Sequence, residues 1–205
     1  IKKMSEKNQL SKSEHLKLSK FCKKFNIFYA CTAFDLNSLK FLDKKLKVPF
    51  FKIPSGEVTS LDMIDYISKQ KKPIIFSTGM SNFKEIKKVK SKLEKFNKNK
   101  ITILHCISQY PAQIKNVNLN IIDELKRKFK CDIGYSDHTT DEETCISAVA
   151  KGATIIEKHV TLSKKMNGPD HKISSTIKEF KILVEKIRKV EKLLGKNKKK
   201  FSKEE

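Results

Sequence analysis

The chain has 205 residues, a length that suits one domain or part of a larger one. Its 38% hydrophobic content is enough to bury a core, which argues against global disorder. No apolar run approaches the roughly 18 residues that a membrane helix needs, and no signal peptide is visible. The five cysteines are widely spaced without a CxxC motif, which argues against a disulfide framework. We therefore expect a cytoplasmic protein without a membrane partner.

The net charge of +22 permits nucleic-acid binding, but its distribution favours another explanation. Arg127 and Arg188 are the only arginines, whereas proteins that bind phosphates and bases favour the arginine fork. The lysines are spread over the polar faces of almost every predicted helix. We therefore expect no nucleic-acid partner, and a surface that attracts an anionic substrate is compatible with the charge. A basic nucleic-acid-binding protein is the alternative from a different functional class.

Short apolar runs alternate with amphipathic segments along the chain. The runs that we predict as strands are residues 26–34, 50–55, 73–78, 101–107, 131–136 and 154–159. Their nearly continuous apolar character is typical of strands that are covered on both faces. The segments that we predict as helices are residues 10–25, 36–46, 60–69, 83–96, 118–129, 142–151 and a last helix that opens at 174–176 and ends at Gly195. Its expected inward residues are Ile177, Phe180, Val184, Ile187, Val190 and Leu194.

These repeated βα units, each of about 25 residues, predict an α/β fold with a parallel sheet and right-handed crossovers. A doubly wound sheet and a (β/α)₈ TIM barrel both fit this rhythm, and a barrel needs two more units. We expect residues 1–195 to form the catalytic barrel in part, with strands three to eight, and its first two βα units to be missing. Residues 196–205 have no apolar period, which is typical of a linker.

Every predicted strand ends with small or ionisable residues. These are Thr32, Lys52, Ser55, Glu57, Ser77, Thr78, Ser108, Tyr110, Ser136, His138, Glu157, Lys158 and His159. In parallel α/β folds ligands bind at the carboxyl ends of the strands. Packing alone does not explain such a set, so we predict a functional pocket.

Two histidines, His138 in "GYSDHT" and His159 in "GATIIEKH", follow successive predicted strands. Singly, each is more simply a hydrogen-bonded loop histidine, but as a pair they can meet at one metal ion. Their expected oxygen-bearing neighbours are Glu57, Asp137, Glu157 and Asp170. Two imidazoles among oxygens favour Mn²⁺ or Mg²⁺ with open positions, whereas zinc more often has a third strong ligand.

Lys52 lies among apolar residues in "FFKIPS", where a lysine is costly unless it is paired. Its ammonium can bind a phosphate or carboxylate, form a Schiff base with a lowered pKa, or extend outward to solvent. Asp170 in "NGPDHK" can serve a sugar hydroxyl or a proton transfer, or belong to a plain surface turn. His105 lies within an apolar strand and is expected to be a core histidine.

An ordered set of motifs resembles the N-acetylneuraminate (sialic acid) synthase family, which includes synthases of legionaminic- and pseudaminic-type acids. The motifs are "CTAFD", "KIPSGE", "STGM", "HCISQYPA", "NLNII", "GYSDHT", "GATIIEKHVTL" and "GPDHK". The resemblance covers about residues 10–205. It implies a (β/α)₈ barrel that condenses phosphoenolpyruvate with an N-acetylated amino sugar, either N-acetylmannosamine or a related 2,4-diacetamido hexose. The products are a nine-carbon 2-keto acid and phosphate.

The resemblance also implies roles for individual residues. By position, His138 and His159 resemble the family's metal ligands, with Mn²⁺ expected first and Mg²⁺ or Co²⁺ as alternatives. The residues that resemble its phosphoenolpyruvate-binding groups are Thr32, Lys52, Ser55, Ser77 and Ser136. Those that resemble its contacts to the amino sugar and the catalytic centre are Glu57, Tyr110 and Asp170. Ser108 stands where some members have asparagine at a phosphate contact, and Glu57 is our candidate for handling the proton of water.

For the complete protein the resemblance implies a homodimer with a small antifreeze-like (SAF) domain after the tail. The family also uses a lysine and a glutamate from the first barrel strands and an arginine from the partner subunit's C-terminal domain. None of these lies in the chain, so we expect the chain alone to be inactive. Another phosphoenolpyruvate-dependent aldol synthase on the same barrel is the nearest alternative.

Overall fold

The computed structural model describes residues 9–96 and 100–196. The chain divides into two compact units, Ile1–Ser77 with Ser81–Thr102, and Thr78–Met80 with Ile103–Glu205. The predicted linker 196–205 lies outside the described residues except for its first residue. Within the part of the chain that the structure describes, no helix combines the length and apolar character needed to cross a membrane.

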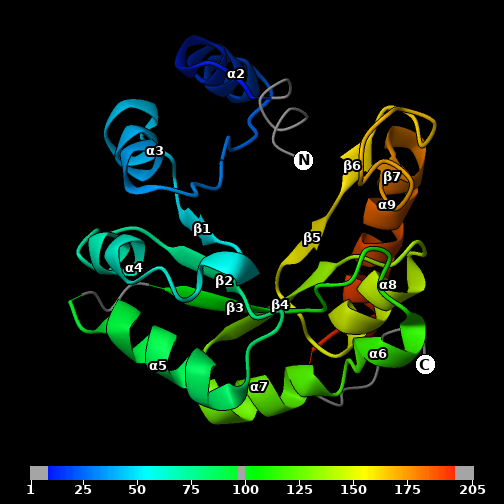
Figure 1. Ribbon diagram of the computed structural model, residues 1–205. Coiled ribbons are helices and arrows are strands. Elements are labelled where there is room, and N and C mark those ends of the chain that lie inside the picture. The colour runs from blue at the N-terminus through cyan, green and yellow to red at the C-terminus, as the bar shows by residue number, and fades with distance from the viewer. Residues whose placement is uncertain (1–8, 97–99, 197–205) are drawn as a thin grey trace. The chain divides into compact units, whose positions relative to one another are not determined.

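The first unit alternates helices with two parallel strands. Its elements are α2 (Lys12–Lys24), α3 (Leu36–Phe41), the π-helix η1 (Leu42–Leu46), β1 (Phe51–Ile53), the 3₁₀ helix η2 (Ser55–Glu57), α4 (Leu61–Ser68), β2 (Ile74–Ser77) and α5 (Phe83–Glu94). β1 pairs with β2 in parallel, with Lys52 opposite Ile75. Helices α4 and α5 pack against each other (Figure 1). Capping boxes begin α2 at Ser11 and α5 at Asn82, which explains where these helices start.

The second unit contains the remaining strands and the longest helix that the structure describes. Its elements are β3 (Ile101–Cys106, whose first two residues belong to the first unit), α6 (Ile114–Val117), α7 (Ile121–Phe129), β4 (Asp132–Asp137), α8 (Glu143–Ala150), β5 (Ile156–Lys158), β6 (Val160–Thr161), β7 (Ser175–Thr176) and α9 (Ile177–Leu194). Strands β3, β4 and β5 are neighbours in that order, and β6 pairs with β7 separately. Helix α8 lies beside α9 (Figure 1).

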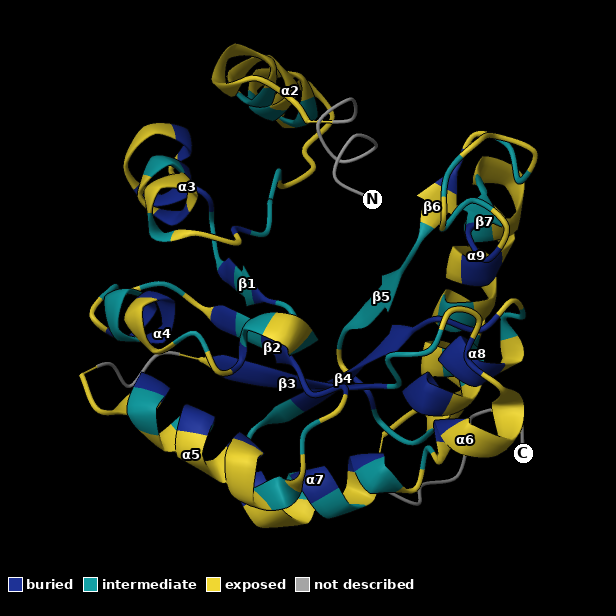
Figure 2. Cartoon of the chain, in the orientation of Figure 1, coloured by how far each residue is buried: buried dark blue, intermediate teal, exposed yellow. Residues whose placement is uncertain are grey.

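The strand β4 is buried along nearly its whole length (Figure 2). Gly134 lets the chain before β5 come close to it. A Cβ at Gly134 would lie 2.5 Å from the backbone oxygen of Ile155. That oxygen accepts a 2.8 Å hydrogen bond from the N–H of Tyr135. Because only glycine leaves room for this approach, Gly134 fixes the spacing of the two chain segments that lead to the histidines.

The predicted strand at residues 26–34 is wrong. Residues 27–33 are in neither helix nor strand, and among the described residues they pair with no other strand. Phe28 in this segment is 80% exposed. An apolar run indicates burial, but a strand also needs backbone partners, and the sequence run does not show whether a partner is present. The other predicted strands are confirmed as β1 to β5.

The last predicted helix is confirmed in its ends and in part of its inward face. Thr176 caps α9, and Gly195 follows it with a φ of 58°. The buried residue of this helix is Leu183, which the prediction left out, whereas Ile177, Val184 and Leu194 are exposed. Phe180, Ile187 and Val190 of the predicted stripe are half-buried. Leu183 lines a cavity with Phe180 and Ile187 beside Val149 of α8, so the face that meets α8 includes part of the apolar stripe that the sequence indicates.

Candidate active site

Two histidines lie close together in the second unit. His138 directly follows β4, and His159 directly follows β5. Their ring centroids are 5.3 Å apart, and the planes are inclined by 65°. The ring of Tyr110 lies 4.1 Å from that of His138 and 5.8 Å from that of His159. The rings therefore meet as their strand positions predicted, and their role as metal ligands stays a prediction.

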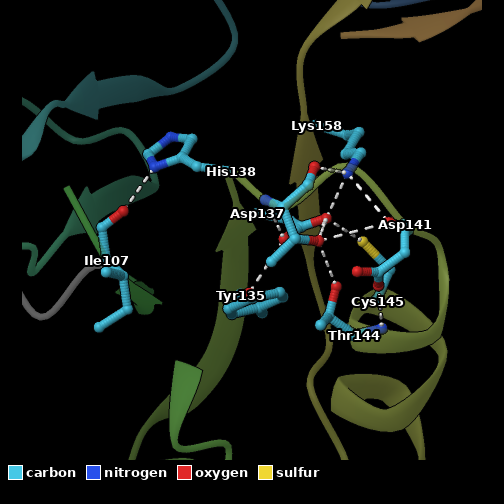
Figure 3. Close-up of polar contacts among 9 residues, drawn as sticks. Ile107, Tyr135, Asp137, His138, Asp141, Thr144, Cys145 and Lys158 are labelled. Carbon is cyan, nitrogen blue, oxygen red and sulfur yellow. Dashed lines mark hydrogen bonds and ion pairs between the residues drawn. The ribbon is translucent and has the colours of Figure 1, made fainter. Parts of the chain in front are cut away.

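The ring of His138 is held by a hydrogen bond to Ile107, the residue that follows β3. Its Nδ1 lies 2.7 Å from the carbonyl oxygen of Ile107 (Figure 3). The same Nδ1 lies 3.9 Å from Sγ of Cys106. Since a carbonyl can only accept, Nδ1 carries the proton and the neutral ring has its lone pair on Nε2. Burial lowers the pKa of His138, but the hydrogen bonds to Cys106 and Ile107 outweigh it, and the pKa lies above its ordinary value. The backbone N–H of Ala112 also donates to the His138 carbonyl, at 2.8 Å.

Side-chain oxygen atoms lie near His159 and on the strands that lead to the two histidines. Nδ1 of His159 is 3.9 Å from Oδ2 of Asp170, whose side chain is half exposed. On the neighbouring strands, Oγ of Ser136 donates a 2.7 Å hydrogen bond to Oε1 of Glu157. Burial and the nearby acidic groups, Cys106, Asp170 and Glu157, raise the pKa of the Tyr110 hydroxyl. The histidine pair therefore sits in surroundings that can complement a positive charge.

The side chains around the two imidazoles limit how the predicted metal could be held. Within residues 9–96 and 100–196, no group of three or more His, Cys, Asp or Glu side chains is arranged to hold a metal ion. The fixed Nδ1 of His138 leaves Nε2 as its ligating nitrogen, the arrangement common to metal-binding histidines. Two imidazoles 5.3 Å apart fit an ion that takes its other ligands from water or substrate.

One predicted metal neighbour points elsewhere. Asp137 was expected near the metal, and Lys158 was expected in the ring of polar groups around the pocket. In the structure Asp137 pairs with Lys158 on the opposite side of the strands from His138, next to Cys145 of α8 (Figure 3). Burial raises the pKa of Asp137, but Lys158 and the N–H of Thr139 outweigh it and lower the pKa. Side chains alternate along a strand, so residues next to the histidines face away from them.

In the first unit Lys52 reaches the end of the neighbouring strand. Its Nζ donates to Oγ of Ser77 at 2.8 Å and to the carbonyl of Ile53 at 3.4 Å. Lys52 and Glu57 line the same small cavity, and Glu57 accepts a hydrogen bond from Oγ of Ser60. The ammonium and a hydroxyl therefore lie together on one face of this strand pair, an arrangement that suits an anion.

The other predicted site residues divide between the units. Thr32 and Ser55 are half-buried in the first unit, and Ser108 is half-buried in the second. Tyr110 is 52% exposed, whereas Ser136 is buried. The expectation for His105 is confirmed, because its buried Nε2 lies 2.7 Å from the Val117 carbonyl, and burial lowers its pKa.

The pairing of Asp137 with Lys158 was not predicted from the sequence. Each residue comes directly before one of the two histidines, and the two are opposite each other in the β4–β5 register. The alternation of side chains along a strand was the available signal, because it puts both residues on one face and both histidines on the other.

The chain matches one protein family and several known proteins. The model of the NeuB family matches residues 1–199. The chain is 45% identical over 204 residues to an N,N'-diacetyllegionaminic acid synthase of Campylobacter jejuni, covering 98% of this chain and 61% of the relative. It is 38% identical over 198 residues to a protein of the same name from Legionella pneumophila, covering 95% of this chain and 55% of the relative. The chain thus spans less than two thirds of these relatives.

A solved structure resembles nearly the whole chain. It is the N-acetylneuraminic acid (sialic acid) synthetase of Leptospira borgpetersenii serovar Hardjo-bovis, with a TM-score of 0.90 and 34% sequence identity. The likeness covers 96% of this chain and 68% of that chain. It confirms the predicted class of fold, an α/β barrel of which the chain forms a part.

Proposed function

Because the chain belongs to the NeuB family, we propose that the complete protein is a nonulosonate synthase that condenses phosphoenolpyruvate with an N-acetylated amino sugar. The products are a nine-carbon 2-keto sugar acid and inorganic phosphate. The observation that carries the proposal is the pair of imidazoles 5.3 Å apart, just past the ends of two adjacent parallel strands. The names of the two relatives favour a 2,4-diacetamido hexose over N-acetylmannosamine as the sugar.

In this proposal His138 and His159 hold a divalent cation, with Mn²⁺ expected first and Mg²⁺ or Co²⁺ as alternatives. A cation bound there would polarise the carbonyl oxygen of the sugar aldehyde as a Lewis acid. The Ile107 carbonyl keeps the proton of His138 on Nδ1, so that Nε2 stays available to the ion. Asp170 and Tyr110, which lie beside the imidazoles, are proposed to contact the sugar.

The phosphoenolpyruvate is assigned to the basic and hydroxyl groups. Lys52 with Ser77 supports this assignment, because an ammonium next to a hydroxyl can bind a phosphate or carboxylate by charge-assisted hydrogen bonds. The other hydroxyls proposed for the anion are those of Thr32, Ser55, Ser108 and Ser136. Holding the substrate at several points also lowers the entropy cost of bringing C3 to the aldehyde.

The reaction forms one carbon–carbon bond and breaks one carbon–oxygen bond. C3 of phosphoenolpyruvate attacks the aldehyde carbon of the sugar, and the aldehyde oxygen takes up a proton as it becomes a hydroxyl. Water adds to the resulting cationic C2 and gives up a proton. The bond between C2 and the phosphate oxygen then breaks, which releases inorganic phosphate and leaves the 2-keto acid. Glu57 is the proposed acceptor of the water proton.

The proposal includes the assembly of the complete protein. Residues 1–195 are part of its catalytic barrel, and residues 196–205 lead to a C-terminal SAF domain. The complete protein is a cytoplasmic homodimer in which the partner subunit supplies an arginine to the site.

The test is a phosphate-release assay on the full-length protein. It uses phosphoenolpyruvate, Mn²⁺ and a panel that contains 2,4-diacetamido hexoses, N-acetylmannosamine and sugar phosphates without an N-acetyl group. His138→Ala and His159→Ala are each expected to lower turnover by roughly 100-fold or more, since each removes a ligand of the ion. His15→Gln, which removes an imidazole from α2, is the matched control with unchanged turnover.

Three outcomes would contradict parts of the proposal. Activity that survives chelation and both histidine substitutions would exclude the metal role. Activity confined to sugar phosphates would favour the other aldol synthases on this barrel. Trapping of pyruvate on Lys52 by borohydride would show a Schiff-base mechanism instead.

A further inference from the structure

A buried ion pair joins the two strands that carry the histidines. Asp137 is the last residue of β4 and Lys158 the last residue of β5, and the two are directly opposite in the parallel register. The Lys158 ammonium donates to Oδ2 of Asp137. The Lys158 side chain is 3% exposed and the Asp137 side chain 0%, so both charges lie away from water. Two desolvated charges are costly, and apolar residues of similar size are often no less stabilising, so stability alone does not explain this pair.

The pair also holds the chain that follows the first histidine (Figure 3). Asp137 accepts a 2.9 Å hydrogen bond from the N–H of Thr139 and a 3.2 Å one from Sγ of Cys145. The Lys158 ammonium donates to the carbonyl oxygens of Thr139 at 2.7 Å and Asp141 at 3.2 Å. Among the described residues, every buried side-chain nitrogen and oxygen has a hydrogen-bond partner. Both charges are therefore satisfied, as a rigid network requires.

Hydrogen bonds hold the backbone beside each histidine. His138 lies between Asp137 and Thr139, which are bonded to each other. His159 follows Lys158, and its own carbonyl accepts a 2.9 Å hydrogen bond from the N–H of Ser175. The ion pair faces α8, while the His138 ring lies on the other face of the strands (Figure 3). The His159 ring lies 5.3 Å from the His138 ring. Because both side chains of the pair face away from the imidazoles, the backbone is what connects the pair to the histidines.

We propose that Asp137 and Lys158 are positioning residues that set the separation of the two imidazoles. Opposite charges at the last paired position of β4 and β5 stabilise this register, and a slip by one residue would turn a histidine to the other face. The importance of the separation for metal binding rests on the proposed function. The claim that the pair sets the separation does not rest on the proposed function, because the separation can be measured without a metal.

The experiment measures ring contact and metal affinity in the same variants. The full-length protein is labelled on histidine, and ring signals are assigned with His138→Gln and His159→Gln. Asp137→Asn and Lys158→Met are expected to lose the nuclear Overhauser contact between the His138 and His159 rings in metal-free protein that circular dichroism shows to be folded. Affinity for Mn²⁺, measured by titration calorimetry, is expected to fall about 10- to 100-fold, a loss of the size seen when residues that orient metal ligands are replaced.

A second buried aspartate supplies the matched control. Asp43 pairs with Lys72 in the first unit, and its side chain is 4% exposed. Asp43→Asn removes a buried carboxylate of the same kind, and both the ring contact and the Mn²⁺ affinity of the folded protein are expected to stay at their original values. A loss of ring contact in this control would overturn the proposal, because it would show a general effect of lost stability.

The positioning proposal can still be tested if a single variant does not fold or if the protein binds no Mn²⁺. If either single variant does not fold, Asp137→Asn combined with Lys158→Gln removes both charges without leaving one unpaired. A weakened ring contact in that variant supports the proposal, and a ring contact like that of the unmodified protein overturns it. If the unmodified protein keeps its ring contact but binds no Mn²⁺, the metal role fails while the positioning proposal is still decided by the ring contact.

Discussion

The two units each contain a buried aspartate that is paired with lysine, but the lysines differ. In the first unit Lys72 bonds Asp43 at 2.8 Å and keeps 24% of its side chain exposed. In the second unit Lys158 is 3% exposed and Asp137 is completely buried. The first pair therefore leaves its ammonium partly in water, whereas the second has lost the hydration of both charges.

This difference indicates what each pair contributes. A half-hydrated pair can add stability at small cost, because only one charge is removed from water. A fully buried pair recovers its desolvation cost only where its geometry is good and further hydrogen bonds satisfy both charges. The pair of the second unit has such bonds and lies one residue from each histidine. The second unit thus carries a costly network where positions of side chains matter most.

The largest expected effect comes from removing one charge of the buried Asp137–Lys158 pair. Lys158→Met leaves Asp137 buried without its cation, and we expect the free energy of unfolding to fall by about 3–5 kcal/mol. Lys72→Met should cost about 1 kcal/mol, because Asp43 keeps its contacts to Lys44 and Tyr66. Urea unfolding followed by circular dichroism measures both. Equal losses would show that the two pairs are energetically alike and would remove the basis of the comparison.

The two units also differ in how much room surrounds a glycine, since Gly134 of the second unit is crowded and Gly56 of the first is not. Gly134→Ala places a Cβ 2.5 Å from the Ile155 oxygen, and the strands must move apart, which we expect to cost about 1–3 kcal/mol. Gly56 of the first unit has no atom within 4 Å of such a Cβ. Gly56→Ala should therefore change the free energy of unfolding by less than about 0.5 kcal/mol. Thermal and urea unfolding of both variants test this, and a tolerated alanine at Gly134 would contradict it.

The pair of the first unit should be visible in the pH dependence of stability. Burial raises the pKa of Asp43, but hydrogen bonds from Lys72, Lys44 and Tyr66 outweigh it and lower the pKa from 3.8 to about 2. A carboxyl with a lowered folded pKa adds stability above its unfolded pKa and loses it as the pH falls through the folded value. The contribution is therefore about 2 kcal/mol near neutral pH and disappears between about pH 4 and pH 2.

Asp43→Asn isolates this contribution. The difference in free energy of unfolding between the unmodified protein and the variant should shrink as the pH is lowered from about 5 to about 2.5. Urea titrations at several pH values measure the difference. A difference that stays constant over this range would show that the carboxyl of Asp43 is not stabilised by its three partners.

Local patterns allowed much of the fold and part of the site to be predicted. The cap at Thr176 and the stop at Gly195 depend on neighbours within a few residues, and both were found. The meeting of His138 and His159 followed from parallel strands whose carboxyl ends share one edge. These predictions needed only the order of the elements and the rules of a parallel sheet.

Features that depend on distant partners could not be predicted. The segment 27–33 has a strand-like sequence, but pairing is decided by another part of the chain. Asp137 is a different case, because the alternation of side chains along β4 was available as a signal, but the predicted strand ended at Ser136, one residue before it. The sequence therefore indicated an acidic group near the metal, while the structure pairs that carboxylate with Lys158 on the opposite face.

The smallest expected difference concerns the capping boxes that begin α5 in the first unit and α9 in the second. Oδ1 of Asn82 accepts from two backbone N–H groups, those of Lys84 at 2.9 Å and Glu85 at 3.1 Å. Oγ1 of Thr176 accepts from the N–H of Glu179 at 3.3 Å. Replacement by alanine leaves these N–H groups without their side-chain acceptor, and each such cap contributes typically about 1 kcal/mol.

Asn82→Ala should therefore lower the free energy of unfolding slightly more than Thr176→Ala, with both losses between about 0.5 and 2 kcal/mol. Asn82→Ser and Thr176→Ser keep an oxygen acceptor and serve as matched controls with smaller losses. Urea unfolding of the four variants gives the order. A larger loss at Thr176 would mean that the start of α9 supports more than its own helix, because β7 ends at this residue and pairs with β6 directly after His159.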